Sequence, residues 1–448
     1  MSESLFRPLF VPEAFRAATG GSAWLQAMLD AEAALAVAEA RVGLIPAEAA
    51  EAIAACCFAD RFDPEEIGQA GWASGNPVPP LVRALTEAVP DPAAAYVHQG
   101  ATSQDILDTA AMLVSRRALD LILSEVDGIS EACARLADDH RATIMAGRTL
   151  LQQALPTTFG LKAAGWLVAV LEARKRLRAT RETGLAAQLG GAAGTLASLD
   201  RSGIRVLEEF AGALDLPVPV VPWHTSRFRI AEIGNTLALL AGVLHKMALD
   251  IVLMAQAEVA EVAEPSDGGR GGSSTLPHKR NPIGSVLSSA GARRVQSLAG
   301  TLQAAIAQEH ERAAGGWHAE WEALGDALAL TGGLASEMRR VVKGLQVYPD
   351  RMRKNLAATG GLLLAENVTK ILAEYVGRLD AHDLVSAAAQ RTLDAGGLLR
   401  EELLEIPEVN QHLSPEEVDA ALDPGRYLGS AEEFVDRALA LYRKEMTE

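Results

Sequence analysis

Apolar residues recur at spacings of three and four along most of this chain, and that pattern predicts a mainly helical protein. In the middle of the chain the pattern runs unbroken over five long stretches. Each predicts a helix of about thirty residues, which at a rise of 1.5 Å per residue would be about 45 Å long. The predicted long helices are 113–145, 159–187, 230–262, 283–312 and 317–345. Helices of this length normally bury their apolar faces in a bundle, often one shared between subunits.

Shorter helical patterns, separated by proline-rich connections, flank the five long segments on both sides. We therefore expect an all-α protein of three helical domains. The expected domains are an N-terminal domain over residues 1–111, a central long-helix bundle over 112–359, and a C-terminal domain over 360–448.

The overall charge narrows the range of partners. The chain has a formal net charge of -17, which argues against nucleic acid as a partner because binding phosphates needs an extended basic face.

The three cysteines of the chain fit neither a disulfide framework nor a metal site. The most apolar stretch, 237–253, contains His245, Lys246 and Asp250, so we do not expect it to span a membrane. With no signal peptide apparent at the amino terminus, the prediction is a cytoplasmic, soluble protein.

One basic stretch stands out in this acidic chain. Residues 268–294 contain five arginines or lysines and no acidic residue, which suggests that an anion binds there. Glycines on both sides of Arg270 predict a mobile loop that could lie close to a ligand, although a plain surface loop leading into a helix would have a similar composition. From Pro282 onward the spacing becomes helical, with Asn281 as a possible cap, and backbone N–H groups at a helix start attract anions.

The wording of this loop resembles a known family. GSSTLPHKRNP, residues 272–282, is similar to the GSSxMPxKxNP loop of the superfamily that contains fumarase, aspartase, argininosuccinate lyase and adenylosuccinate lyase. The resemblance implies that Ser273 is the base that moves a proton on the carbon next to a carboxylate. It also implies that Lys279 and Asn281 hold that carboxylate. Further candidates in this loop for contacts with the substrate are Arg270, Ser274 and His278, although His278 could equally be a contact between subunits.

A second segment, VHQGATSQDILDT at 97–109, resembles the HxGxTSxD region of the same superfamily. From spacing alone, its small hydroxyl residues read best as the cap of a following helix. The resemblance implies instead that Thr102 and Ser103 bind a substrate carboxylate, and that His98 is an acid or an orienting group.

A third segment, GRTLLQQALPTTFG at 147–160, carries an informative departure. Several lyases of the superfamily have a catalytic histidine at the position of Leu150, and leucine cannot donate a proton. The cycloisomerases of the superfamily also lack that histidine. Thr149 and Gln152 match the family pattern and are candidate substrate ligands, whereas Phe228 stands where the family commonly has aspartate.

Similarity to the bacterial cycloisomerases extends over nearly the whole chain and carries implications of its own. It implies lactonisation of 3-carboxy-cis,cis-muconate to 4-carboxymuconolactone in protocatechuate degradation, without a cofactor or metal. It also implies a homotetramer whose sites, each binding a small polycarboxylate, are shared between subunits. The alternatives are a lyase that eliminates a good anionic leaving group from a substituted succinate, and a non-catalytic relative.

The sequence does not decide the roles of two histidines. His224 either neutralises a substrate carboxylate or contacts another subunit, and His310 lies either near the site or in a salt-bridged interface.

Overall fold

The computed structural model describes residues 5–266, 269–272, 275–276 and 278–447. The protein is mainly helical, as the sequence predicted, with two small two-stranded sheets among the described residues. It divides into two compact units. Unit 1 comprises Met1–Asp127, Glu172–Lys246 and Val286–Arg339, and unit 2 comprises Gly128–Leu171, Met247–Ser285 and Arg340–Glu448.

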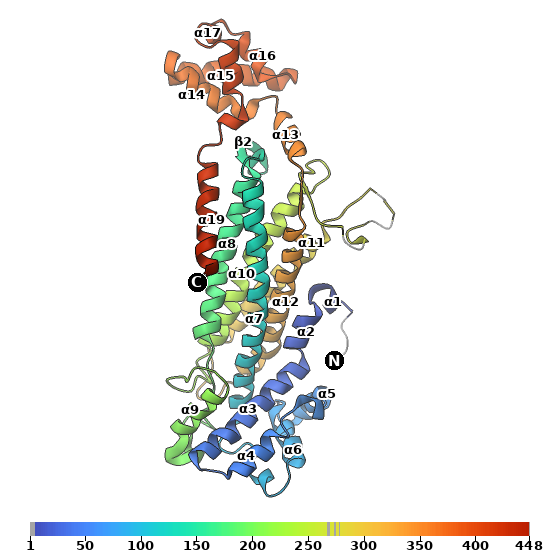
Figure 1. Cartoon of the computed structure of the whole chain (residues 1–448), viewed down its shortest axis with the longest axis vertical. Helices are drawn as coiled ribbons and strands as arrows, with labels where there is room; N and C mark the ends of the chain where they lie inside the picture. Colours follow the sequence, from blue (N-terminus) through green and yellow to red (C-terminus); the bar gives the residue numbers. More distant parts are fainter. Residues whose placement is uncertain (1–4, 267–268, 273–274, 277, 448) are drawn as a thin grey trace. The chain divides into compact units, whose positions relative to one another are not determined.

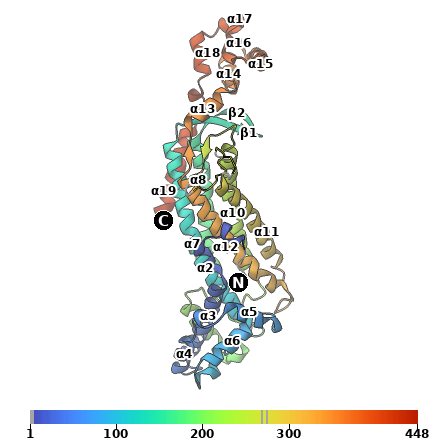
Figure 2. The same cartoon turned by 90° about the vertical axis from the view of Figure 1, so that its right-hand side faces the viewer.

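Five long helices form the middle of the chain (Figures 1 and 2). They are α7 (Ser103–Asp139), α8 (Phe159–Ala179), α10 (Phe228–Met254), α11 (Ile283–Ala304) and α12 (Gly316–Lys343). Each contributes residues to both units. The five predicted helices are therefore present, with altered ends, while the division into three domains stays a prediction.

One helix end differs from the prediction because a hairpin follows α7. The sequence pattern suggested that this helix continues to residue 145, but it ends at Asp139 and is followed by the hairpin of β1 (Ile144–Thr149) and β2 (Gln152–Thr158). The imidazole Nδ1 of His140 lies 3.1 Å from the hydroxyl of Thr143 in the intervening turn. Side-chain hydrogen bonds of this kind favour a turn over a continued helix. Similarly, α8 ends in the π-helical turn Thr180–Gly184.

Unit 1 also contains the first helices of the chain and α9. They are α1 (Arg7–Phe10), α2 (Glu13–Thr19), α3 (Gly21–Val42), α4 (Ala47–Ala54), α5 (Pro64–Ala70), α6 (Val78–Ala88) and α9 (Gly203–Ala213). Helix α3 packs against both α4 and α9, and its buried face carries leucines, alanines and two glutamates, Glu32 and Glu39. Acidic residues are almost never fully buried without a partner, so these two call for an explanation.

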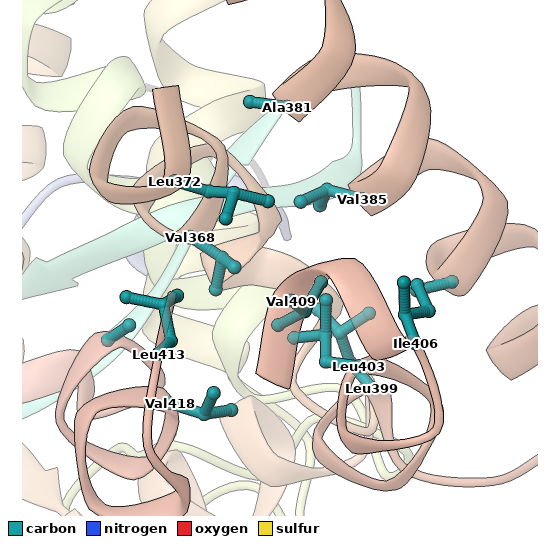
Figure 3. Close-up of a cluster of buried hydrophobic side chains, with 12 residues drawn as sticks. Val368, Leu372, Ala381, Val385, Leu399, Leu403, Ile406, Val409, Leu413 and Val418 are labelled. Carbon is teal, nitrogen blue, oxygen red and sulfur yellow. The ribbon is translucent and has the colours of Figure 1, made fainter. Parts of the chain in front are cut away.

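The last part of the chain, in unit 2, has a core of its own. Its helices are α13 (Pro349–Ala357), α14 (Ala365–Val376), α15 (Arg378–Ala395), α16 (Leu399–Leu404), α17 (Pro407–Asn410), α18 (Pro415–Ala421) and α19 (Ala431–Thr447). Val368, Leu372 and Val385 of α14 and α15 face Leu403 and Val418 across this core (Figure 3). The short strands β3 (Val262–Ala263) and β4 (Gln346–Val347) pair elsewhere in unit 2.

Helix α10 is the one helix in the described part of the chain that is long and apolar enough to cross a membrane on composition alone. The carboxylate of Asp250 in this helix accepts a hydrogen bond of 2.7 Å from the indole of Trp166, and the buried face of α10 contributes leucines to the protein core. Such a partner for Asp250 is typical of a core helix in a bundle.

Candidate active site

The neck of the glycine-rich loop in unit 2 is closed by hydrogen bonds. The carbonyl of Gly271 accepts from the backbone N–H of Asn281 at 2.8 Å and from its side-chain Nδ2 at 3.2 Å. Gly271 has a φ of +82°, and a Cβ there would lie 2.5 Å from the Asn281 carbonyl oxygen, so only glycine fits. The predicted base Ser273 and its neighbour Ser274 lie outside the described residues.

Helix α11 begins directly after this neck, and its first N–H groups already have an anionic partner. The carboxylate of Glu264 accepts from the N–H groups of Gly284 (2.9 Å) and Ser285 (2.7 Å), and from the Ser285 hydroxyl (2.6 Å). The sequence suggested Asn281 as the cap and an anion at this helix start. The cap suggestion is wrong, because Asn281 fastens the loop neck, and the carboxylate at the helix start is that of Glu264 from within the chain.

The loop does present positive charge. His278, Lys279 and Arg280 are exposed, and no carboxylate within the described ranges pairs with them. Behind the neck lies a cavity of about 210 Å³ whose lining includes Arg270, Asn281 and Tyr348. Glu264 and Arg280 line the cavity as well. Two arginines and the Asn281 amide, beside a cationic loop, suit a small carboxylate-bearing ligand.

The β1–β2 hairpin, also in unit 2, ends in two exposed leucines. Leu150 and Leu151 have φ values of 50° and 67°, and their side chains are 96% and 77% exposed. Leucines rarely occupy this left-handed region, and such strain is commonly kept where a function needs it. Thr149 and Gln152 pair with each other beside the tip and are exposed too.

The base of this hairpin is held by an ion pair. Arg148 donates to both carboxylate oxygens of Glu261, at 2.9 and 2.7 Å, and Nδ2 of Asn355 donates to the same carboxylate at 2.9 Å. Because the Glu261 side chain is completely buried, this charged group ties the hairpin to the segment that leads into the loop.

In unit 1, the segment before α7 is organised by Asp105. One carboxylate oxygen accepts from the N–H of Gly190, and the other accepts from the N–H groups of Gly191 and Thr102, at 2.8 to 3.1 Å. Burial raises the Asp105 pKa to about 6, although these hydrogen bonds oppose the shift. Asp105 therefore performs the capping, and the hydroxyls of Thr102 and Ser103 make no hydrogen bond to a described residue.

His98, in the same segment, contacts an acid that the sequence analysis did not consider. Its Nδ1 lies 2.6 Å from the carboxylate of Glu32 in α3. A glutamate within the apolar AEAALAVAEA pattern was the signal that could have pointed to it.

His224 and its neighbour Arg227 are both buried in unit 1. Arg227 is 1% exposed and forms ion pairs with Asp108 and Glu320. Burial and the nearby Arg312 lower the pKa of His224, whose Nδ1 has no partner in the described part of the chain. Arg227 is therefore committed to two buried carboxylates, and a neutral His224 is a poor partner for a substrate carboxylate.

Helix α11 ends at Ala304, earlier than the predicted end at residue 312. His310 lies in an exposed loop, not in the predicted helix, and has a φ of 46°. Nearby, Arg312 donates to the side chain of Gln104 at 2.8 Å and to the carbonyl of Gly191, so it supports the turn that Asp105 organises.

The predicted site residues thus fall into two sets. His98, Thr102 and Ser103 belong to unit 1, and Thr149, Gln152, Arg270, His278, Lys279 and Asn281 belong to unit 2. Within the described residues, no group of histidines, cysteines and carboxylates could hold a metal ion.

Comparisons with known proteins find similarity over nearly the whole chain. Residues 12–297 match the lyase family, and residues 361–438 match the adenylosuccinate lyase C-terminus. A 3-carboxy-cis,cis-muconate cycloisomerase of Bradyrhizobium diazoefficiens is 47% identical over 97% of each chain. A nitrosuccinate lyase of Streptomyces davaonensis is 45% identical over 98% of this chain and 95% of its own.

A solved structure agrees with these relatives. The 3-carboxy-cis,cis-muconate lactonizing enzyme of Pseudomonas putida superposes with a TM-score of 0.94 at 43% identity, over 99% of each chain. The resemblance inferred from the three motifs is thereby confirmed, together with the fold. This chain belongs to the lyase family, within the fumarase/aspartase superfamily and next to its cycloisomerases.

Proposed function

We propose that this protein is a cycloisomerase that converts 3-carboxy-cis,cis-muconate into 4-carboxymuconolactone in protocatechuate degradation. The observation that carries the proposal is the hairpin tip, which offers Leu150 and Leu151 and no group that could donate a proton. Full-length similarity to cycloisomerases supports the same reaction.

The chemistry of lactonisation explains why a hairpin tip without a proton donor is sufficient. In lactonisation, a carboxylate oxygen of the substrate adds to one of its own double bonds, and the neighbouring carbon receives a proton. In reverse, the proton leaves carbon and the carboxylate departs as a stable anion, so the leaving group scarcely needs an acid. Amines and hydroxide are poorer leaving groups and would require one.

Ser273 would be the carbon acid and base in this scheme. Lys279 and Asn281 would hold the carboxylate next to the reacting carbon, where cations and N–H donors stabilise the enolate-like state. Asn281 has a second N–H besides the one that it donates to Gly271. Other groups proposed to complete the pocket are Thr102, Ser103, Thr149, Gln152, Arg270, Ser274, His278 and His98.

We also propose that the enzyme works as a cytoplasmic homotetramer, without a cofactor, with sites shared between subunits. Support comes from the first half of α10, where Phe228 and Leu239 are 65% and 60% exposed. Eleven residues apart on a helix, they lie on the same face, and a second copy of the chain would cover them.

A second candidate is a lyase that expels a good anionic leaving group from a substituted succinate. The nitrosuccinate lyase favours it specifically, because it is nearly as similar to this chain as the cycloisomerases are. Its substrate would need no leaving-group acid at position 150 either.

One experiment separates the two candidates. Purified protein is mixed with 3-carboxy-cis,cis-muconate while the conjugated diene absorbance is followed, and then with nitrosuccinate while fumarate formation is followed. Rapid loss of the diene supports the cycloisomerase. Fumarate formation alone would favour the lyase, and no change with either substrate would favour a non-catalytic relative.

A further inference from the structure

A buried acid and an imidazole form a pair in unit 1, between helix α3 and the turn before α7. The Nδ1 atom of His98 lies 2.6 Å from Oε1 of Glu32, and the Glu32 side chain is only 1% exposed. His98 itself adopts a φ of 60°, in the left-handed region that is unusual for a residue with a Cβ. Strain of this kind is typical of residues that a functional site holds in place.

The contact with His98 compensates only one of the two carboxylate oxygens of Glu32. Its other oxygen, Oε2, is buried without a hydrogen-bond partner in the part of the chain that the structure describes. A buried carboxylate is costly unless a cation or a donor compensates it. A protonated His98 supplies both a positive charge and an N–H donor.

The charges around His98 favour its protonated form. Burial pulls the pKa of His98 down, but the charge and hydrogen bond of Glu32, together with the charge of Asp105 from α7, raise it overall. Glu39, whose charge interacts with that of Glu32, lies seven residues further along α3. Burial and the charge of Glu32 raise the pKa of Glu39 to about 8, so Glu39 is neutral at pH 7.

The pair also decides which nitrogen of His98 is left for a ligand. Since Nδ1 is engaged by Glu32, Nε2 is the outer nitrogen. No described residue hydrogen-bonds it, and the side chain is 19% exposed. Carboxylates that orient an imidazole in this way fix its tautomer and stabilise its cation.

We propose that Glu32 is a positioning residue, which holds His98 as an imidazolium and directs its Nε2–H toward a carboxylate of the substrate. This rests on the proposed function for the identity of the ligand, but the pair itself does not depend on it. A fixed N–H cation is a stronger partner for a carboxylate than a neutral imidazole that can rotate.

The test measures the protonation of His98 without any substrate. Diethyl pyrocarbonate acylates only the neutral imidazole, so the labelling rate against pH gives the midpoint of its titration. Trypsin releases residues 84–116, in which His98 is the single histidine, and mass spectrometry quantifies its label. For the full-length wild-type protein we expect a midpoint above the ordinary value of 6.5.

Three variants complete the design. Glu32→Gln removes the charge beside His98, and the midpoint should fall by about 1 to 3 pH units. Glu39→Gln is the matched control on the same buried face of α3, and it should leave the midpoint in place. Glu32→Asp keeps the charge and should restore most of the shift.

The same variants are then compared in the diene assay. Glu32→Gln should move the alkaline limb of kcat/KM to lower pH and raise KM more than it lowers kcat, while Glu39→Gln should do neither. A wild-type labelling midpoint at or below 6.5 would overturn the proposal even if Glu32→Gln fails to fold. So would equal shifts in the two glutamine variants. A raised midpoint in a protein that does not lactonise the muconate would overturn the proposed function alone.

Discussion

Replacement of Arg227 by methionine should destabilise the protein far more than replacement of any surface arginine. The Arg227 guanidinium is bound to Asp108 by two hydrogen bonds of 2.6 and 2.9 Å and contacts Glu320 at 2.5 to 3.1 Å. All three side chains are 1% to 3% exposed. It also lies 4.9 Å from the ring centre of Trp223.

The magnitude follows from what Arg227→Met would leave behind. Methionine fills much of the arginine stem, so the main loss is the charge, and two buried carboxylates then lose the cation that pairs with both of them. Removal of one partner from a buried ion pair costs about 3 to 5 kcal/mol. Burial already raises the pKa of Glu320, and loss of Arg227 would raise it further. Glu320 would then accept a proton, which favours the lower end of that range.

Arg181→Met is the matched control within the same unit. Arg181 also makes two hydrogen bonds to one carboxylate, that of Asp120, at 2.7 and 3.3 Å. The difference is exposure, since these side chains are 34% and 50% exposed. An exposed pair contributes about 0 to 1 kcal/mol.

The assay is urea unfolding of both variants and the wild type, followed by circular dichroism at one protein concentration. Arg227→Met should shift the midpoint strongly to lower urea, and Arg181→Met should shift it little. Equal midpoints for the two variants would refute the reasoning that burial makes the Arg227 network decisive.

Three further predictions concern single residues. Glu39 has a pKa of about 8 in the folded chain against 4.5 for an unperturbed glutamate, so the folded state binds more protons between these values and stability falls as pH rises from about 5 to 8. In Glu39→Gln the free energy of unfolding should fall less steeply with pH, by up to about 1.4 kcal/mol per pH unit. Urea midpoints at several pH values measure this dependence, and the same dependence in variant and wild type would contradict the prediction. Glu264→Gln should lower the free energy of unfolding by about 1 to 2 kcal/mol, because it weakens the anionic cap of α11. It should also raise KM for the muconate. An unchanged urea midpoint would contradict the role of Glu264 as a cap. Gly271→Ala should also raise KM, because its Cβ would collide with the Asn281 carbonyl oxygen; a normal KM would show that the neck tolerates the change.

The long helices were predictable from the chain because apolar spacing alone determines which face is buried. Their ends were less predictable, since local side-chain bonds decide them. The pattern up to residue 145 favoured a continuous helix, yet the contact between His140 and Thr143 accompanies a turn and a hairpin. Similarly, Asn281 had the chemistry of a helix cap, but Glu264, seventeen positions earlier, occupies the helix start instead.

The sequence indicates candidate site residues where they form contiguous motifs, but it does not reveal contacts with residues that are distant in sequence. The serine loop and the segment around His98 are readable from a few adjacent letters. The buried ion pairs of Arg227 could not be predicted, because nothing near it in sequence reveals its partners, Asp108 and Glu320, which lie 119 and 93 residues away. Glu32 was overlooked for the same reason.

The central claim, that the hydroxyl of the loop serine moves the proton on carbon, is tested most directly by Ser273→Ala. Initial rates of diene loss from 3-carboxy-cis,cis-muconate are measured for this variant and the wild type, with equal urea midpoints as evidence that both are folded. We expect rapid loss with the wild type and only the background rate with the alanine variant. A near-normal rate without the hydroxyl would contradict the account.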